Sequence, residues 1–411
     1  MNKILPNTII LKDQIGSQTE GEAGKPPRWL RFSNPTHVIQ TKDLSQVQSC
    51  LKDVEKYVDD GFYAAGLISY EASPAFDPAM ITHTASDFPL MWFGIYRECE
   101  TISELPDGDQ DDFQLGEWKP SVSVEHYNAA IAKIKQHIYD GDTYQVNYTM
   151  RLHNEFSGDP WNLFRKLQKV QHTDYQAYVT FDKFSICSVS PELFFDKDQQ
   201  RISCRPMKGT IKRGLTNKQD AERAQWLRDS EKNQSENVMI VDMIRNDLGT
   251  IAKLGTVNVE KLFSIEKYAT VHQMTSTVAA TTTASISEII GKMFPCASIT
   301  GAPKVKTMEI IRDLEVGPRG IYTGSIGYIA PNGKTQFNVA IRTVVIDTET
   351  NIAEYGVGGG IVWDSDATDE YEECKTKAAV LMQEPPEFDL FESLLWDAEH
   401  GLTFLTTILH D

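Results

Sequence analysis

The chain has 411 residues, and its 58 acidic against 40 basic side chains give a formal net charge of −18. This balance disfavours a nucleic-acid or anionic-membrane partner, because both are polyanions. The same charge would repel a small anionic substrate, so any site for such a substrate needs its own source of positive charge.

The cysteine pattern and the hydropathy of the sequence indicate the compartment in which the protein is expected. The six cysteines are scattered without a C-x-x-C pair, which indicates neither a disulfide framework nor a zinc site. Residues 1–14 lack the apolar core of a signal peptide, and no stretch approaches the roughly 18 apolar residues of a spanning helix. We therefore expect a cytoplasmic protein without a membrane or nucleic-acid partner.

The first part of the chain predicts strands, a linker and a helix, in that order. Residues 61–70 and 90–96 are short, apolar and aromatic, as buried strands are. The polar, acid-rich residues 101–112 predict a linker. Ser123 then occupies the capping position of a helix with one apolar face, and Gly141 ends that helix.

The second part predicts more strands, interrupted by long helices. Residues 177–190 and 193–205 are expected to form strands with a polar turn at 196–200. Residues 321–330 and 335–346 are expected to form a hairpin turned at 331–333. Long helices are expected near residues 217–254, 303–315 and 369–382. Hairpins interrupted by helices are typical of an α+β protein.

Several common catalytic patterns are absent from the sequence. No P-loop, dinucleotide-binding glycine pattern, nucleophile elbow or H-E-x-x-H motif occurs. Nucleotide hydrolysis, Rossmann-type redox chemistry and serine hydrolysis therefore lose support.

Two glutamates in separate predicted helices are candidate metal ligands. Apolar residues surround nearly the whole helix at 235–248, so Glu236 is expected to be buried and must be paired, neutralised or bound to a metal. An ion pair with Arg245 is the simpler alternative. Glu373 ends the acidic run 364–373, which can also be explained as a solvated helix start. Two part-buried carboxylates from different helices are a usual way to hold Mg²⁺.

A lysine between proline and glycine is a candidate nucleophile. Lys208 lies in 206–210 at the end of a predicted strand, where rigid backbone can project it into a cleft. A nucleophilic role requires a pKa below the usual value of about 10.4, and Lys212 and Arg213 could supply the necessary repulsion. Two alternatives for Lys208 are a role in Schiff-base formation and a plain surface position without a catalytic role.

Further elements favour the binding of an anion. Ser298 precedes a helix that starts near Pro303, so free backbone N–H groups face the preceding loop. Arg342 lies in a predicted strand, and the glycines of 356–360 leave backbone amides open to a carboxylate.

Together these segments resemble the chorismate-utilising enzymes, a family that includes anthranilate, aminodeoxychorismate, isochorismate and salicylate synthases. Five motifs occur in the family's order: SPELF at 190–194, RPMKGT at 205–210, SENVMIVDMIRNDLG at 235–249, ITGAPKVKTMEIIRDLE at 299–315, and YGVGGGIVWDSD with EYEECKTKA towards the end. The resemblance implies two orthogonally packed antiparallel sheets flanked by helices, in four αββα layers.

The resemblance also implies roles for single residues. The family's Mg²⁺ ligands match Glu236 and Glu373, and its general acid/base matches Glu192. Its substrate contacts match a larger set: Ser298, Tyr322, Arg342, Gly358, Gly360, Gly209 and Thr210. The lysine of P-x-K-G-T, here Lys208, is similar to the aminodeoxychorismate synthases of p-aminobenzoate and folate synthesis, whereas anthranilate synthases have alanine there.

The activity implied is that of a transaminase-type transferase. Chorismate and ammonia would give 4-amino-4-deoxychorismate through a covalent intermediate on Lys208. The chain has no glutaminase signature, so a glutamine amidotransferase subunit is the expected partner and source of ammonia. Anthranilate synthase, a non-catalytic metabolite-binding subunit and a PLP enzyme using Lys208 are the alternatives.

The resemblance implies a division of the chain into three parts, and the sequence differs from the family's pattern at one functional position. We expect an N-terminal subdomain over 1–115, a chorismate-binding catalytic domain over 120–383, and a tail over 384–411 that resembles the start of a fused aminodeoxychorismate lyase. Anthranilate synthases have a functional histidine where this chain has Gln273, with His272 beside it. We therefore assign no catalytic role to His272.

Overall fold

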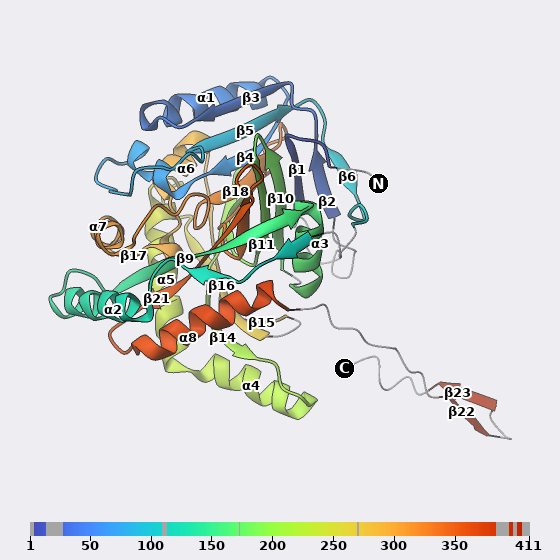
Figure 1. Ribbon diagram of the computed structural model, residues 1–411, viewed down its shortest axis with the longest axis vertical. Coiled ribbons are helices and arrows are strands. Elements are labelled where there is room, and N and C mark those ends of the chain that lie inside the picture. The colour runs from blue at the N-terminus through green and yellow to red at the C-terminus, as the bar shows by residue number, and fades with distance from the viewer. Residues whose placement is uncertain are drawn as a thin grey trace.

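The computed structural model describes residues 4–13, 28–108, 113–171, 173–268 and 271–383, and the strand backbones at 394–397 and 401–404. Within these residues, two large antiparallel sheets are flanked by helices, which confirms the predicted α+β fold (Figure 1).

The first sheet has eleven strands, and their order across most of its width is β17-β9-β21-β20-β11-β10-β1-β2-β6. Their bounds are β1 (Thr8–Asp13), β2 (Arg28–Phe32), β6 (Glu100–Ile102), β7 (Phe113–Leu115), β8 (Lys119–Pro120), β9 (Gln145–Gly158), β10 (Tyr175–Phe181), β11 (Phe184–Ser190), β17 (Gly301–Ala302), β20 (Thr343–Asp347) and β21 (Ile352–Ile361). Strands β7 and β8 both pair with β9.

The second sheet has ten strands in the order β14-β16-β13-β12-β19-β18-β4-β5-β3, with β15 also paired to β16. Their bounds are β3 (His37–Thr41), β4 (Tyr63–Ile68), β5 (Met91–Tyr96), β12 (Leu193–Asp198), β13 (Arg201–Arg205), β14 (Met207–Lys212), β15 (Asn258–Lys267), β16 (Val271–Thr281), β18 (Ser325–Ile329) and β19 (Thr335–Asn338). Strand β14 therefore lies at one end of this sheet.

Apolar side chains fill the space between the sheets and the space under the helices. Between the sheets, Trp92 of the second stacks on Phe181 of the first, with ring centroids 4.9 Å apart. The helices are α1 (Leu44–Asp59), α2 (Val124–Tyr139), α3 (Pro160–Val170), α4 (Asn217–Asp229), α5 (Glu231–Gly249), α6 (Ile286–Met293), α7 (Lys304–Leu314) and α8 (Ala367–Ala378), with short 3₁₀ turns at Tyr70–Ala75, Ala297–Ile299 and Ala379–Leu381. Helices α2, α3 and α8 pack on the first sheet, and α1, α5 and α6 on the second.

Local signals explain where the helices begin and end. The Ser123 hydroxyl accepts a hydrogen bond from the backbone of His126, which confirms the predicted cap of α2. The single long helix expected over 217–254 is wrong, because Ser230 is extended and caps a second helix, α5. Helix α5 is also not buried all round, since Val238 is 38% exposed.

Two predicted strands are divided in the structure, and a third segment turns where expected. Residues 177–190 form the hairpin β10–β11, which turns at Asp182 with a φ of +45°. Residues 193–205 form the hairpin β12–β13, whose turn at Gln199, with a φ of +51°, lies within the polar turn predicted at 196–200. The hairpin turned at 331–333 is confirmed as β18–β19, but its second strand stops at Asn338.

Two of the places where the chain crosses between the sheets lie next to each other. Residues 191–192 lead from β11 in the first sheet to β12 in the second, and residues 339–342 lead from β19 back to β20. Backbone hydrogen bonds join the crossings, from the Val339 N–H to the Glu192 carbonyl (3.0 Å) and from the Val189 N–H to the Arg342 carbonyl (3.1 Å). Arg342 is thus in a crossing with a φ of +51° and not within a strand, as predicted.

The proposed division of the chain stays a prediction. Strands β1 and β2 belong to the first sheet and β3, β4 and β5 to the second, so the N-terminal residues contribute to both. From the tail, the structure describes only a hairpin of β22 (Leu394–Asp397) and β23 (Gly401–Phe404); its remaining residues lie outside the described part. Among the described helices, none has the length and apolar content needed to cross a membrane.

Candidate active site

A β-bulge sets the position of Lys208 on strand β14. Met207 lies opposite Thr275 of β16 and Thr210 lies opposite Gln273, so Lys208 and Gly209 together face one residue. Gly209 has a φ of +90° and its Cβ position would be 2.9 Å from the Asn233 side chain of α5, so only glycine fits there.

The Lys208 amine reaches from the second sheet to the first. A Cβ added to Gly360 of β21 would lie 3.4 Å from Nζ of this half-buried lysine. Within the described part of the chain, no hydrogen bond or ion pair engages the amine. The structure therefore presents an uncommitted amine between the two sheets.

Arg213, which we expected to repel the Lys208 ammonium, is engaged elsewhere in the structure. Arg213 makes two hydrogen bonds of 2.7 Å with the Asp220 carboxylate, which neutralises its charge. Asp220 also contacts Nε2 of His272 at 2.9 Å. Arg213 is therefore not the free cation beside Lys208 that the sequence suggested, and His272 belongs to this separate cluster.

Glu192 lies at the first crossing, next to Lys208 and Ser298. Its side chain is buried, and Oε1 has no hydrogen-bond partner within the described residues. Burial raises the pKa of this carboxyl, and the Ser298 hydroxyl and the Lys208 ammonium offset only part of that shift. A carboxyl in this setting keeps its proton at a higher pH and can act as an acid.

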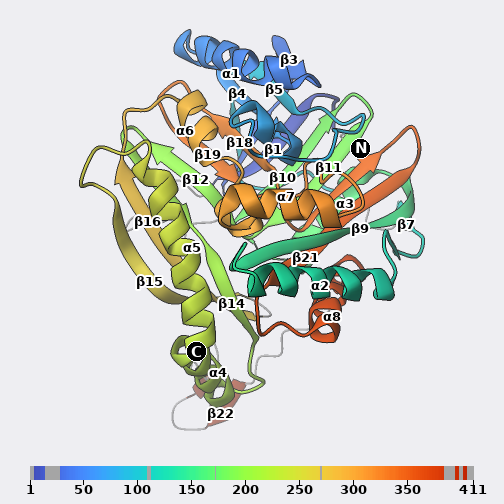
Figure 2. The ribbon, with the colours of Figure 1, turned by 90° about the vertical axis from the view of Figure 1, so that its left-hand side faces the viewer.

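Helix α8, which lies beside α2 (Figure 2), carries two carboxyls whose pKa values the charge of Lys232 on α5 lowers. Desolvation raises the pKa of Glu373, but Lys377 at 2.7 Å, Lys208 and Lys232 outweigh it, and the net shift is downward. Glu370, one turn earlier, has a pKa raised by burial, and it accepts a hydrogen bond from the Ser365 hydroxyl at 2.7 Å. We did not identify Glu370 from the sequence, although its spacing of three from Glu373 places both on one helix face.

Glu236 faces the same lysines from helix α5. It lies one turn after Lys232, whose charge lowers the pKa of Glu373 on α8. Glu236 is half-buried and has no polar partner among the described residues, and Arg245 pairs with Asp242 instead. The alternative of a Glu236–Arg245 ion pair is therefore wrong.

The acid set fits a hard divalent cation in its chemistry. Its donors are carboxylate oxygens, which Mg²⁺ prefers, and Glu236 is uncommitted. Glu373 is more open than predicted, with 55% of its side chain exposed. Within the described residues, no three acidic, histidine or cysteine side chains form a ready-made metal group.

Several of the remaining predicted contact residues already have partners in the structure. Arg342 donates to the Gln171 side chain at 3.1 Å, burial lowers its pKa, and no described carboxylate pairs with it. The Gly358 carbonyl accepts a hydrogen bond from Lys377 at 2.7 Å. The Thr210 hydroxyl is already committed to Gln273 at 2.7 Å.

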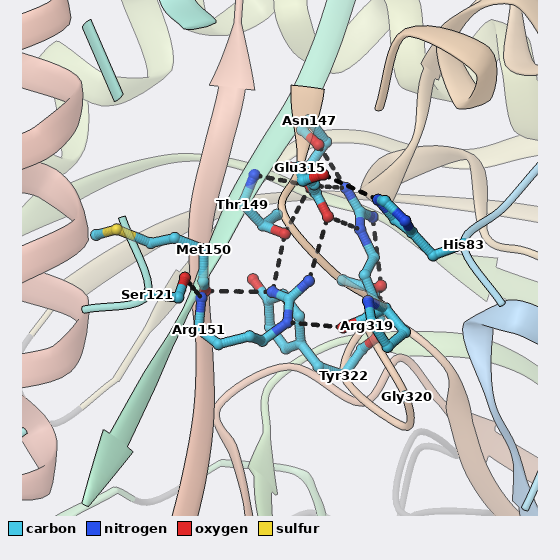
Figure 3. Close-up of polar contacts among 12 residues, drawn as sticks. His83, Ser121, Asn147, Thr149, Met150, Arg151, Glu315, Arg319, Gly320 and Tyr322 are labelled. Carbon is cyan, nitrogen blue, oxygen red and sulfur yellow. Dashed lines mark hydrogen bonds and ion pairs between the residues drawn. The ribbon is translucent and has the colours of Figure 1, made fainter. Parts of the chain in front are cut away.

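A buried charge network holds Tyr322, and we did not predict it (Figure 3). The Glu315 carboxylate accepts hydrogen bonds from Arg319 at 2.7 Å and from Arg151 at 3.2 Å. Arg151 lies over the Tyr322 ring, 5.0 Å from its centroid. Arg319 also donates to the carbonyl of Ile299, beside Ser298, at 2.9 Å. The network therefore joins two segments that carry predicted substrate contacts.

Comparisons with known proteins agree with this arrangement. The chain matches the chorismate binding enzyme family over residues 14–383. It is 37% identical over 348 residues to aminodeoxychorismate synthase component 1 of Escherichia coli strain K12, covering 78% of this chain and 76% of that protein. It is 36% identical over 268 residues to anthranilate synthase component 1 of Aquifex aeolicus strain VF5, covering 65% and 54%.

A solved structure supports the fold. The crystal structure of anthranilate synthase component I from Streptococcus pneumoniae TIGR4 superposes with a TM-score of 0.76 at 21% identity, covering 90% of this chain and 97% of that one. At this identity the likeness shows the fold alone.

Replacing Glu315 should destabilise the whole fold. Glu315→Ala leaves the buried guanidinium groups of Arg151 and Arg319 without a counter-ion, which should cost about 3–5 kcal/mol in the free energy of unfolding. Urea denaturation followed by circular dichroism measures this loss. Glu309→Ala on the same helix is the control, because its ion pair with Lys306 is partly exposed and should contribute at most about 1 kcal/mol. Equal losses in the two variants would contradict the role of the network.

Proposed function

Because the chain belongs to the chorismate binding enzyme family, we propose that it converts chorismate and ammonia to 4-amino-4-deoxychorismate. The observation that carries the proposal is the uncommitted Lys208 amine beside buried Glu192, at the meeting of the two sheets. The relative named aminodeoxychorismate synthase component 1 supports the same product.

The proposed chemistry uses Lys208 as nucleophile and Glu192 as acid. After its ammonium has released a proton to solvent, the Lys208 amine forms a bond to C2 of the substrate ring while the bond from C4 to its hydroxyl breaks. Glu192 gives its proton to the leaving oxygen, which departs as water, and takes up a proton from the nitrogen now bonded to C2. Ammonia then forms a bond to C4 and displaces the amine from C2. The enolpyruvyl group stays attached, so no pyruvate is released.

The charged groups of the cleft bind and orient the substrate. Arg342, which has no carboxylate partner within the described residues, is placed to pair with a substrate carboxylate. Glu236 and Glu373 would hold Mg²⁺, which supplies positive charge for the other carboxylate. Ser298 and the backbone of Gly358 and Gly360 complete the proposed contacts.

Ammonia is proposed to come from a glutamine amidotransferase subunit. The described part of the chain has no group assigned to glutamine hydrolysis, and the component 1 naming of the Escherichia coli relative supports a two-part enzyme. Free ammonia at high concentration should replace the subunit, which lets the isolated chain be assayed.

Lys208 can be tested directly by mass spectrometry. Incubation of the wild-type chain with chorismate and Mg²⁺ but no ammonia should add the mass of chorismate less water to the Lys208 peptide. Lys208→Ala should lack the adduct and lose ammonia-dependent formation of 4-amino-4-deoxychorismate by at least about 10³-fold, because a nucleophile is removed.

The same assay separates the alternatives. Full activity of Lys208→Ala would disprove the covalent mechanism. Release of pyruvate with a fluorescent aromatic product would identify anthranilate synthesis instead, and an absence of any turnover would favour a metabolite-binding subunit.

The pH dependence should report the proton on Glu192. Burial raises the pKa of this carboxyl, so kcat/KM should fall only as pH rises through that raised value. Glu192→Gln should lower kcat by about 10²–10⁴-fold. Ser298→Ala removes a hydrogen bond that lowers this pKa, so the descending limb should move to higher pH. If the descending limb of the kcat/KM profile lies at the same pH in Ser298→Ala and wild type, Glu192 is not the group that it reports.

Metal dependence should follow the two proposed ligands. EDTA should abolish turnover, and Glu236→Ala or Glu373→Ala should raise the Mg²⁺ concentration for half-maximal activity by about 10–100-fold or more. Glu372→Ala on the same helix is the control, because this exposed residue pairs with Lys375. Unchanged Mg²⁺ dependence in both test variants would remove these residues as ligands.

A further inference from the structure

The bulge that carries Lys208 lies on a strand that has a single described neighbour in its sheet. Strand β14 is an edge strand, and among the described strands its only neighbour is β16. The ladder between the two strands is interrupted from Met207 to Thr210. A bulge on an edge strand therefore needs another source of support.

The side chain of Gln273 supplies two hydrogen bonds at this interruption. Its Nε2 donates to the Gly209 carbonyl at 2.8 Å, and its Oε1 accepts from the Thr210 hydroxyl at 2.7 Å. Gln273 is itself buried, with 7% of its surface exposed. Both bonds fall on the two residues that directly follow Lys208.

We propose that Gln273 is a positioning residue that holds Lys208 in register for its reaction. A one-residue slip of a strand turns each side chain to the other face of the sheet. The two bonds from Gln273 oppose such a slip, because the Gly209 carbonyl and the Thr210 hydroxyl would both lose a buried partner. The kinetic part of this inference rests on the proposed function of Lys208.

The opposite face of β16 supports the same register. His272, the preceding residue, pairs with Ile211 in the ladder and contacts Asp220 of α4 through its ring nitrogen at 2.9 Å. These two adjacent residues of β16 point to opposite faces of the sheet. Gln273 bonds to β14 on one face, and His272 contacts α4 on the other. Gln273 is the member of this pair that contacts the bulge.

The test compares two variants of strand β16. Gln273→Leu keeps the approximate volume of the side chain but removes both bonds. Thr275→Val is the matched control, since Thr275 lies opposite Met207 at the other end of the bulge but its side chain bonds to Glu266 on β15 and not to residues 208–210. Urea denaturation of both variants gives the loss of stability that each substitution causes.

Hydrogen–deuterium exchange and steady-state kinetics test whether Lys208 keeps its position. Hydrogen–deuterium exchange of the peptide covering residues 205–213 should rise in Gln273→Leu and stay at the wild-type level in Thr275→Val. With saturating ammonia and Mg²⁺, Gln273→Leu should lower kcat by about 10²-fold with KM for chorismate within about threefold, because a displacement near 1 Å has an effect of this size. Thr275→Val should keep kcat within about threefold of wild type, on the same reasoning.

The outcomes separate this inference from the proposed function. Unchanged exchange in Gln273→Leu overturns the positioning role whatever the activity, and so does an equal fall of kcat in the two variants. Increased exchange with an unchanged kcat also overturns it. If Lys208→Ala is fully active, the proposed mechanism fails, while the exchange measurement still decides whether Gln273 holds the bulge.

Discussion

The site depends on two chain crossings that are hydrogen-bonded to each other. Because Val339 bonds to the Glu192 carbonyl and Val189 to the Arg342 carbonyl, the two sheets are fixed relative to one another where the polar groups gather. An acid and a guanidinium thereby lie where the two sheets meet. The Lys208 amine of the second sheet approaches Gly360 of the first.

The charge of the whole chain says little about the charge in the cleft. The formal net charge is −18, yet Lys208, Lys232 and Lys377 all act on the single carboxyl of Glu373, and Arg342 lies nearby without a described carboxylate partner. Short distances and reduced solvent make local charges count for more than distant ones, which salt screens. An acidic protein can in this way keep several cations together at one site.

Local sequence signals predicted the features that depend on neighbouring residues. The cap of α2 by Ser123 and the turn at 331–333 follow from short-range chemistry, and the proline and glycine around Lys208 marked an unusual strand end. The break between α4 and α5 at Ser230 went undetected, because both sides of it are helical in composition.

Features that depend on distant partners could not be predicted in the same way. Residues 335–346 contain no proline or glycine that would mark a break, so their pattern does not show that the chain changes sheets within them. The pairing of Glu315 with Arg151 joins residues 164 positions apart, and no local pattern encodes it. The same holds for the freedom of Glu236, because only the structure shows that Arg245 is engaged elsewhere.

The order of the strands has a consequence for how the chain is made. Strand β1 pairs with β10 through Thr8 and Thr180, and β4 pairs with β18 through Ile68 and Ser325. Each of these strands also has a local partner, since β1 pairs with β2 and β4 with β5. During synthesis, however, the other edge of β1 must wait for residue 180 and that of β4 for residue 325 to leave the ribosome. Such non-local pairing folds slowly and leaves strand edges exposed to aggregation meanwhile. The same interleaving that joins the sheets into one scaffold thus makes the newborn chain dependent on protection.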